Sequence, residues 1–221
     1  MATPHLDEVA TWLAEAGRVV ALTGAGMSTE SGIPDFRGPQ GIWTRDPTAE
    51  RKATIDAWRE EADLRREAWA FRLANRDVAF EPNDAHHAVV ELQRLERLDL
   101  LVTQNIDGLH QDAGANPARL VEVHGTAREV VCLSCGDRRP IGAVLDRVAA
   151  GEDDPHCLDC GGLLKSATIS FGQALVESDM VRAQAAAESA DVFLALGTSL
   201  AVYPVAWLPM LAKRQGARVV I

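Results

Sequence analysis

The stretch RVVALTGAGMSTESGIPDFRG, residues 18–38, decides the fold class of this 221-residue chain. It begins with an apolar run typical of a buried strand and then enters Gly24-Ala25-Gly26. Glycines after a strand let the backbone approach a pyrophosphate, and N–H groups at a helix start bind anionic oxygens. Thr29 replaces the third glycine of a Gly-x-Gly-x-x-Gly fingerprint, so this motif alone predicts either a dinucleotide cradle or a tight turn.

The composition indicates a globular protein, because 47% of the residues are hydrophobic. No apolar run is long enough to span a bilayer. Residues 1–17 carry acidic side chains and no basic region, which predicts an amphipathic helix rather than a secretory signal. A net charge of −10 argues against direct nucleic-acid binding and is compatible with basic partners. We therefore expect a cytoplasmic monomer that binds neither membrane nor nucleic acid.

Strand-like and helical segments alternate along the chain, which predicts an α/β fold with a parallel sheet covered by helices on both faces. The strand-like runs are residues 18–23, 99–104, 119–124, 191–197 and 217–221. The helical patterns are residues 54–76, 84–97 and 174–189. We predict a Rossmann-like domain formed by residues 1–125 and 167–221, with a helical insertion at 50–80.

The four cysteines lie in residues 126–166, where this alternation stops, so we predict an inserted lobe there. They form two Cys-x-x-Cys pairs, and 21 residues separate the pairs: Cys132, Cys135, Cys157 and Cys160. This spacing is typical of a zinc site, and four thiolates complete a tetrahedron, so we predict one structural Zn²⁺. Redox dithiols and disulfides are the alternatives, and stable disulfides are rare in the cytoplasm. His156 is a rival ligand, although the set is complete without it.

A second strand-like run ends in small and hydroxyl-bearing residues, Gly197-Thr198-Ser199. Ligands of open α/β sheets bind in a crevice at the carboxyl ends of the strands. The two glycine-bearing strand ends therefore fit a single ligand site.

Five motifs occur in order and together resemble the sirtuin family, in particular its bacterial members. They are GAGMSTESGIPDFRG (24–38), TQNIDGLHQDAG (103–114), HG (124–125), the paired Cys-x-x-Cys and GTSLAVYP (197–204). The resemblance covers roughly residues 6 to 221 and implies an NAD-dependent protein lysine deacylase. In such enzymes the acyl-lysine carbonyl oxygen attacks C1′ of the nicotinamide ribose and nicotinamide leaves. A ribose hydroxyl, deprotonated by a histidine, then attacks the acyl carbon, and the products are lysine and O-acyl-ADP-ribose.

The resemblance implies that His124 is the general base and that Asn105 holds a ribose hydroxyl or a water. It places Asp107 on the nicotinamide carboxamide and Gln104 on the nicotinamide ribose. From the residues alone, His124 could equally be a structural hydrogen-bonding group, and Asn105 and Asp107 could form a capped turn. His110 lies within the second motif, and we expect it to be structural.

The remaining NAD contacts implied by the resemblance come from three segments. Phe36 would shield C1′ of the ribose, and Arg37 would meet phosphate. Residues 33–49 are rich in Pro and Gly, and we expect them to reorder when NAD binds. The full set is Gly24, Ala25, Gly26, Asp35, Phe36, Arg37, Gly197, Thr198 and Ser199. The family continues beyond residue 221 with further residues that contact adenosine.

The acyl-peptide substrate would add as a strand between residues 170–174 and 200–204, where it would contact Phe171, Gly172 and Val202. The family usually has Phe-Gly-Glu in this loop, and here Gln173 replaces the glutamate.

Sirtuins that remove acidic acyl groups carry a Tyr-x-x-Arg pair in the helical region, and the only tyrosine here is Tyr203. The corresponding segment, 65–76, offers Trp69, Phe71 and Leu73, so we expect acetyl or other neutral acyl groups. Arg72 is the nearby cation that could alter this preference. An NAD hydrolase or ADP-ribosyl transferase, and a non-catalytic NAD or acyl-peptide binding module, are the alternative functions.

Overall fold

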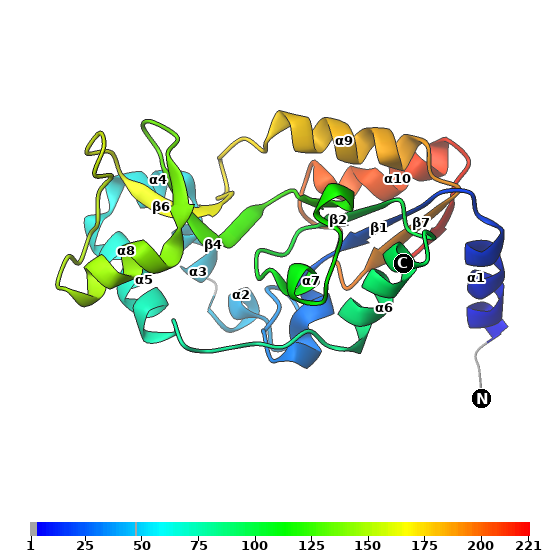
Figure 1. The fold of residues 1–221 in the computed structure, drawn as a ribbon, viewed down its shortest axis with the longest axis horizontal. Helices are drawn as coiled ribbons and strands as arrows, with labels where there is room; N and C mark the ends of the chain where they lie inside the picture. Colours follow the sequence, from blue (N-terminus) through cyan, green and yellow to red (C-terminus); the bar gives the residue numbers. More distant parts are fainter. Residues whose placement is uncertain (1–3, 47) are drawn as a thin grey trace.

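The computed structural model describes residues 4–46 and 48–221, which form two lobes joined by several chain crossings (Figure 1). The N-terminal helix α1 (Pro4–Glu15) confirms the predicted helix, of which residues 1–3 lie outside the described part of the chain. Among the described residues, none of the helices has both the length and the apolar character of a membrane span.

The larger lobe is built on a parallel five-stranded sheet with the order β3-β2-β1-β7-β8. All five predicted strands are confirmed, each slightly shorter than its apolar run. The strands are β1 (Val19–Thr23), β2 (Leu100–Thr103), β3 (Leu120–Glu122), β7 (Val192–Leu196) and β8 (Arg218–Val220).

Helices cover both faces of this sheet, as Figure 1 shows, so the Rossmann-like prediction is confirmed. Val20 and Leu22 of β1 point into a core with α9 (Glu177–Glu188) and α10 (Leu208–Arg214). Val19 and Ala21 alternate to the other face, where α1 and α6 (Asp84–Arg94) pack. This alternation leaves β1 completely buried, because side chains of a strand point in turn to its two faces.

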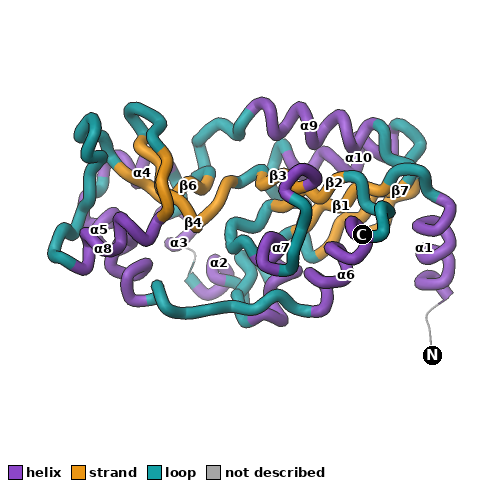
Figure 2. The backbone as a smooth tube through the Cα atoms, in the orientation of Figure 1, coloured by secondary structure: helices purple, strands orange, loops and turns teal. Residues whose placement is uncertain are grey.

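The smaller lobe contains an antiparallel sheet of β4 (Gly125–Cys132), β5 (Arg138–Pro140) and β6 (Leu164–Thr168), in the order β5-β4-β6 (Figure 2). Helix α8 (Ile141–Ala149) packs on it together with α4 (Ile55–Glu60) and α5 (Ala62–Ala74). The helical insertion and the cysteine-bearing segment therefore share one hydrophobic core.

The prediction of one helix over residues 54–76 is wrong, because the chain breaks into α4 and α5 at Glu61. Glu61 has an extended backbone, with φ −106° and ψ 96°, which ends the helical hydrogen bonds of α4. The break turns Trp58 and Trp69 into the same core, where their rings meet edge to face at 5.9 Å. The remaining short helices are α2 (Ile42–Arg45), α3 (Thr48–Lys52), α7 (Leu109–Asp112) and the 3₁₀ helices η1 (Ala25–Ser31), η2 (Pro117–Arg119) and η3 (Val205–Trp207).

The chain passes from the parallel sheet to the small lobe at His124 and Gly125. Gly125 has φ +72°, and a Cβ atom there would lie 2.0 Å from the carbonyl oxygen of Ala167. The N–H of Ile169 donates to the carbonyl oxygen of His124 at 2.8 Å, which fastens the two lobes at this point. The carboxyl ends of the parallel strands face this junction.

Candidate active site

Directly after β1 and β7, the two chain segments contact each other through their backbones and form the β1–β7 crossing. The N–H of Gly24 donates to Leu196 O at 3.0 Å, and the N–H of Gly26 donates to Gly197 O at 2.8 Å. A Cβ atom on Gly197 would lie 2.3 Å from the backbone nitrogen of Met27, and one on Gly24 would lie 2.7 Å from Thr198 Cβ. These glycines are therefore required by the crossing itself, whatever ligand approaches them.

Gln104, at the end of β2, ties this crossing together. Its Nε2 donates to Thr198 Oγ1 at 2.8 Å and lies 3.3 Å from Thr23 O. The strand ends of β1, β2 and β7, which carry most of the predicted NAD contacts, thus form one connected edge.

Asn105 and Asp107 meet at a buried serine that the sequence analysis did not assign to the site. Asn105 Nδ2 donates to Ser28 Oγ and to Gly24 O, both at 3.1 Å, and Ser28 Oγ donates to Asp107 Oδ2 at 2.7 Å. The second Asp107 oxygen accepts the N–H of Leu109 at 2.9 Å. Ser28 is 1% exposed, so its hydroxyl serves this network rather than solvent.

Two buried histidines lie behind this network. His86 Nδ1 accepts the N–H of Asn83 at 3.3 Å, so its proton resides on Nε2, which faces Ser28 Oγ at 3.5 Å. His110 Nε2 contacts Thr23 Oγ1 at 2.9 Å, and its ring lies 4.9 Å from that of His86. Burial, followed by the neighbouring His86, lowers the pKa of His110 to about 4. Both rings are neutral at pH 7, because burial also lowers the pKa of His86.

His124 is half-buried and held in one tautomer. Its Nδ1 lies 3.0 Å from Gln104 O, and a carbonyl oxygen can only accept, so Nδ1 carries the proton. Burial lowers the pKa of His124, which keeps the ring neutral at pH 7. Nε2 therefore holds a free lone pair that can take a proton.

The Asp35-Phe36-Arg37 segment folds back on a tryptophan that the sequence analysis also did not assign to the site. The Phe36 and Trp43 ring centroids are 4.7 Å apart, and the Arg37 guanidinium lies 4.3 Å from the Trp43 centroid. Arg37 also pairs with Glu50 at 3.6 Å. Asp35 Oδ1 accepts the N–H of Gly38 at 2.9 Å, which closes the loop.

The predicted peptide-binding loop runs beside α4. Phe171 donates its N–H to Ala53 O at 3.1 Å and accepts the N–H of Ile55 at 2.9 Å. Gly172 has φ +81°, and Gln173 Oε1 accepts the N–H of Ser170 at 3.2 Å. Gln173 thus closes the turn locally. Val202 lies half-buried on the facing loop after β7.

Of the three apolar residues expected at the acyl pocket, Phe71 is 68% exposed, Trp69 is completely buried in the core of the small lobe, and Leu73 packs against that core. The Arg72 guanidinium lies beside the rings of both Trp58 and Trp69, at 5.7 and 5.6 Å from their centroids. Its guanidinium donates to Ala68 O and to Ser166 Oγ, so it is committed to contacts inside the small lobe.

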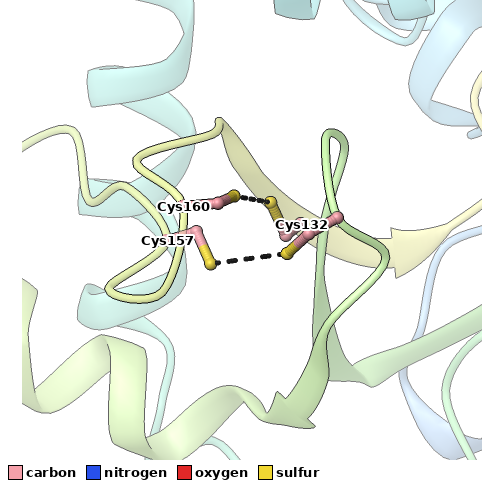
Figure 3. Close-up of side chains that lie close together, drawn as sticks. Cys132, Cys157 and Cys160 are labelled. Carbon is pink, nitrogen blue, oxygen red and sulfur yellow. Dashed lines mark hydrogen bonds between the residues drawn. The ribbon is translucent and has the colours of Figure 1, made fainter.

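The four cysteines converge as predicted (Figure 3). The Cys132 and Cys160 Sγ atoms are 3.4 Å apart, those of Cys135 and Cys157 are 3.8 Å apart, and all four lie within 4.8 Å of one another. Four thiolates bound to zinc at about 2.3 Å would be separated by roughly 3.8 Å in a tetrahedron, so the cluster fits this metal.

Neighbouring groups also suit this metal. The N–H groups of Ser134 and Gly162 point at Cys132 and Cys160 Sγ, each at 3.4 Å. His156 Nδ1 instead lies 2.9 Å from Gly161 O and is not among the converging ligand atoms. The rival ligand is thereby excluded, and the cluster is consistent with a structural zinc.

Comparisons with known proteins agree with these features. The model of the Sir2 family matches residues 24–204. NAD-dependent protein deacetylase 2 of Streptomyces coelicolor is 48% identical over 203 residues, which cover 92% of this chain and 84% of the relative. A solved Sir2 structure with a deacetylated p53 peptide and 3′-O-acetyl-ADP-ribose is similar with a TM-score of 0.87 and 32% identity, covering 98% of this chain and 85% of that one. Sir2Tm bound to a propionylated peptide gives a TM-score of 0.83 and 31% identity, with 98% and 85% coverage.

Proposed function

We propose that His124 is the general base in the reaction of this chain, which belongs to the Sir2 family and is an NAD-dependent protein deacetylase. The observation that carries this proposal is the contact of His124 Nδ1 with Gln104 O at 3.0 Å. It holds the proton on Nδ1 and leaves Nε2 free to take one from a ribose hydroxyl. A positioned base contributes about 10²–10⁴-fold to the rate.

NAD supplies the ribose that accepts the acyl group. Asn105 and Asp107 would hold the nicotinamide half, because Ser28 fixes both side chains at one buried point. An ionised carboxylate accepts hydrogen bonds, which suits Asp107 to the carboxamide N–H₂. At the β1–β7 crossing, Gly26 and Thr198 would lie beside the phosphates. Phe36 would cover C1′ and exclude water from it.

The acyl-lysine peptide would bind as an added strand between the loops that carry Phe171 and Val202. Relatives support a peptide substrate, since one holds a p53 peptide and another a propionylated peptide. We infer that this chain prefers neutral acyl groups. Arg72, the cation that could pair with an acidic acyl group, already donates to Ala68 O and Ser166 Oγ.

One assay separates the proposed function from NAD hydrolysis and from simple binding. The protein is incubated with NAD and an acetyl-lysine peptide, and the products are identified by mass spectrometry. Deacetylation gives O-acetyl-ADP-ribose, hydrolysis gives ADP-ribose and binding alone gives neither. His124→Ala should lower turnover on the order of 10²-fold or more while its circular dichroism stays unchanged. Near-normal turnover in that variant would show that another group is the base.

A further inference from the structure

Trp43 is the one side chain in the described residues found in ring contact with both the cofactor loop and the peptide loop. Its ring centroid lies 4.7 Å from that of Phe36 on one side and 5.5 Å from that of Phe171 on the other. The first neighbour belongs to the segment assigned to NAD, and the second belongs to the segment assigned to the acyl-peptide.

On the cofactor side, Trp43 is joined to Phe36 by more than ring packing. The N–H of Trp43 donates to Phe36 O at 3.0 Å, and the N–H of Ile42 donates to Asp35 O at 2.9 Å. A Cβ atom on Gly41 would lie 2.6 Å from the Phe36 carbonyl, so the backbone of α2 presses directly on this residue. A displacement of Trp43 must therefore displace Phe36.

On the peptide side, the backbone of Phe171 bonds to Ala53 and Ile55, and its ring packs on Trp43. A peptide strand that pairs with residues 170–174 would shift or fix the Phe171 ring, because ring and strand belong to one short turn. Because the Phe171 ring packs on Trp43, a movement of that ring would displace Trp43. The same movement would displace Arg37, because its guanidinium lies 4.3 Å from the Trp43 ring centroid.

We propose that Trp43 is a positioning residue that couples occupancy of the acyl-peptide site to the placement of Phe36 and Arg37 on the cofactor. The proposal rests on the function proposed above. Aromatic contacts of this kind are each worth roughly a two- to tenfold change in an equilibrium constant. Because the two contacts act in series, the weaker one limits the coupling, so we expect a coupling factor of about fivefold, within that range, between the two ligands.

The test is calorimetric. The Kd of ADP-ribose, which does not react, is measured with and without saturating acetyl-lysine peptide for the wild-type protein, Trp43→Ala, Trp43→Phe and Leu95→Ala. In the wild type the two values should differ by about fivefold, and the peptide Kd should change by the same factor when ADP-ribose is added, because coupling is reciprocal. In Trp43→Ala the ratio should fall to within about twofold of unity. Trp43→Phe keeps a ring in place and should retain most of the ratio. Leu95→Ala removes an exposed apolar side chain at the end of α6 and should retain all of it.

A merely structural role for Trp43 would weaken each ligand alone and leave the ratio between the two ADP-ribose affinities unchanged. An unchanged ratio in Trp43→Ala, or a ratio near unity in the wild type, would therefore overturn the coupling while the proposed function stands. Failure of the wild-type protein to bind either ligand would overturn both. Should Trp43→Ala not fold, as judged by circular dichroism, Trp43→Leu gives the same readout.

Discussion

A single added methyl group tests whether the crossing of the β1 and β7 ends builds the cofactor site. In Gly197→Ala, the new Cβ would start 2.3 Å from the backbone nitrogen of Met27 and 2.7 Å from the carbonyl carbon of Gly26. Both neighbours are backbone atoms, so no side chain can swing aside, and the crossing itself must open. Overpacking of this kind costs about 1–3 kcal/mol. The φ of +59° adds roughly 1–2 kcal/mol for a residue with a Cβ atom.

Gly216→Ala is the matched control. Gly216 also has a positive φ, +100°, but nothing lies within 4 Å of its added Cβ. It should lose only the conformational part, about 1–2 kcal/mol. Gly197→Ala should therefore be less stable than Gly216→Ala by about 1–3 kcal/mol, a difference of several degrees in Tm for a chain of this size.

Urea unfolding of both variants measures the stability difference, and titration with ADP-ribose measures the effect on the site. We expect Gly197→Ala to bind ADP-ribose more weakly, because the Gly26 N–H to Gly197 O bond and the position of Thr198 depend on the crossing. Equal unfolding midpoints for the two variants would show that the backbone accommodates the methyl group. Weakened binding in Gly216→Ala to the same degree would show that the effect is not local to the crossing.

Three further predictions concern the metal, the base and the acyl group. Metal analysis should find about one zinc per chain, and chelation or Cys157→Ala should unfold the small lobe; equal stability with and without chelator would contradict this. Because burial holds the pKa of His124 below its usual 6.5, kcat/KM for deacetylation should fall at acidic pH with a midpoint below 6.5, so an acidic midpoint above 6.5 would refute the assignment. The kcat/KM for acetyl-lysine should exceed that for succinyl-lysine by at least about tenfold, because burying the succinyl carboxylate without a cationic partner costs at least about 1.4 kcal/mol. A preference for succinyl-lysine that disappears in Arg72→Met would show that Arg72 reaches the acyl group.

The parts of the fold that could be predicted are those for which adjacent residues carry the signal. Strands β1, β2 and β7 were predictable because they are buried on both faces and therefore appear as continuous apolar runs. The cysteine pairs were predictable because the metal fixes their spacing. Glu61 breaks the predicted helix although no Gly or Pro marks it. The helix ends there because the break lets Trp58 and Trp69 pack in the same core, and this tertiary contact is not visible in the local sequence.

The site was less predictable where its members come from distant segments. Ser28 is a residue type that often caps a helix. Only the fold shows that its hydroxyl accepts a hydrogen bond from Asn105 and donates one to Asp107. Trp43 lies in the short helix α2, and its partner ring, Phe171, is far away in the sequence. For the glycines at these strand ends, the fold shows a structural requirement that the sequence did not reveal. Their closest neighbour is the other strand end, a contact that follows from β1 lying beside β7 in the sheet.

The four-cysteine cluster and His124, the proposed base, lie at opposite ends of the same two strands. Strand β4 begins at Gly125, directly after His124, and ends at Cys132, while β6 pairs with it from Thr168, opposite Gly125, to Leu164, opposite Cys132. At the near end, the N–H of Ile169 fastens the peptide loop to the His124 carbonyl at 2.8 Å. At the far end, Cys132 and Cys160 draw β4 and the start of β6 together. A metal bound by the four cysteines would close the far end and would thereby also limit how far His124 and the peptide loop can separate. The four-cysteine lobe would in this sense be part of the active-site scaffold, since β4 and β6 connect the cysteines to His124 and to the loop of Phe171.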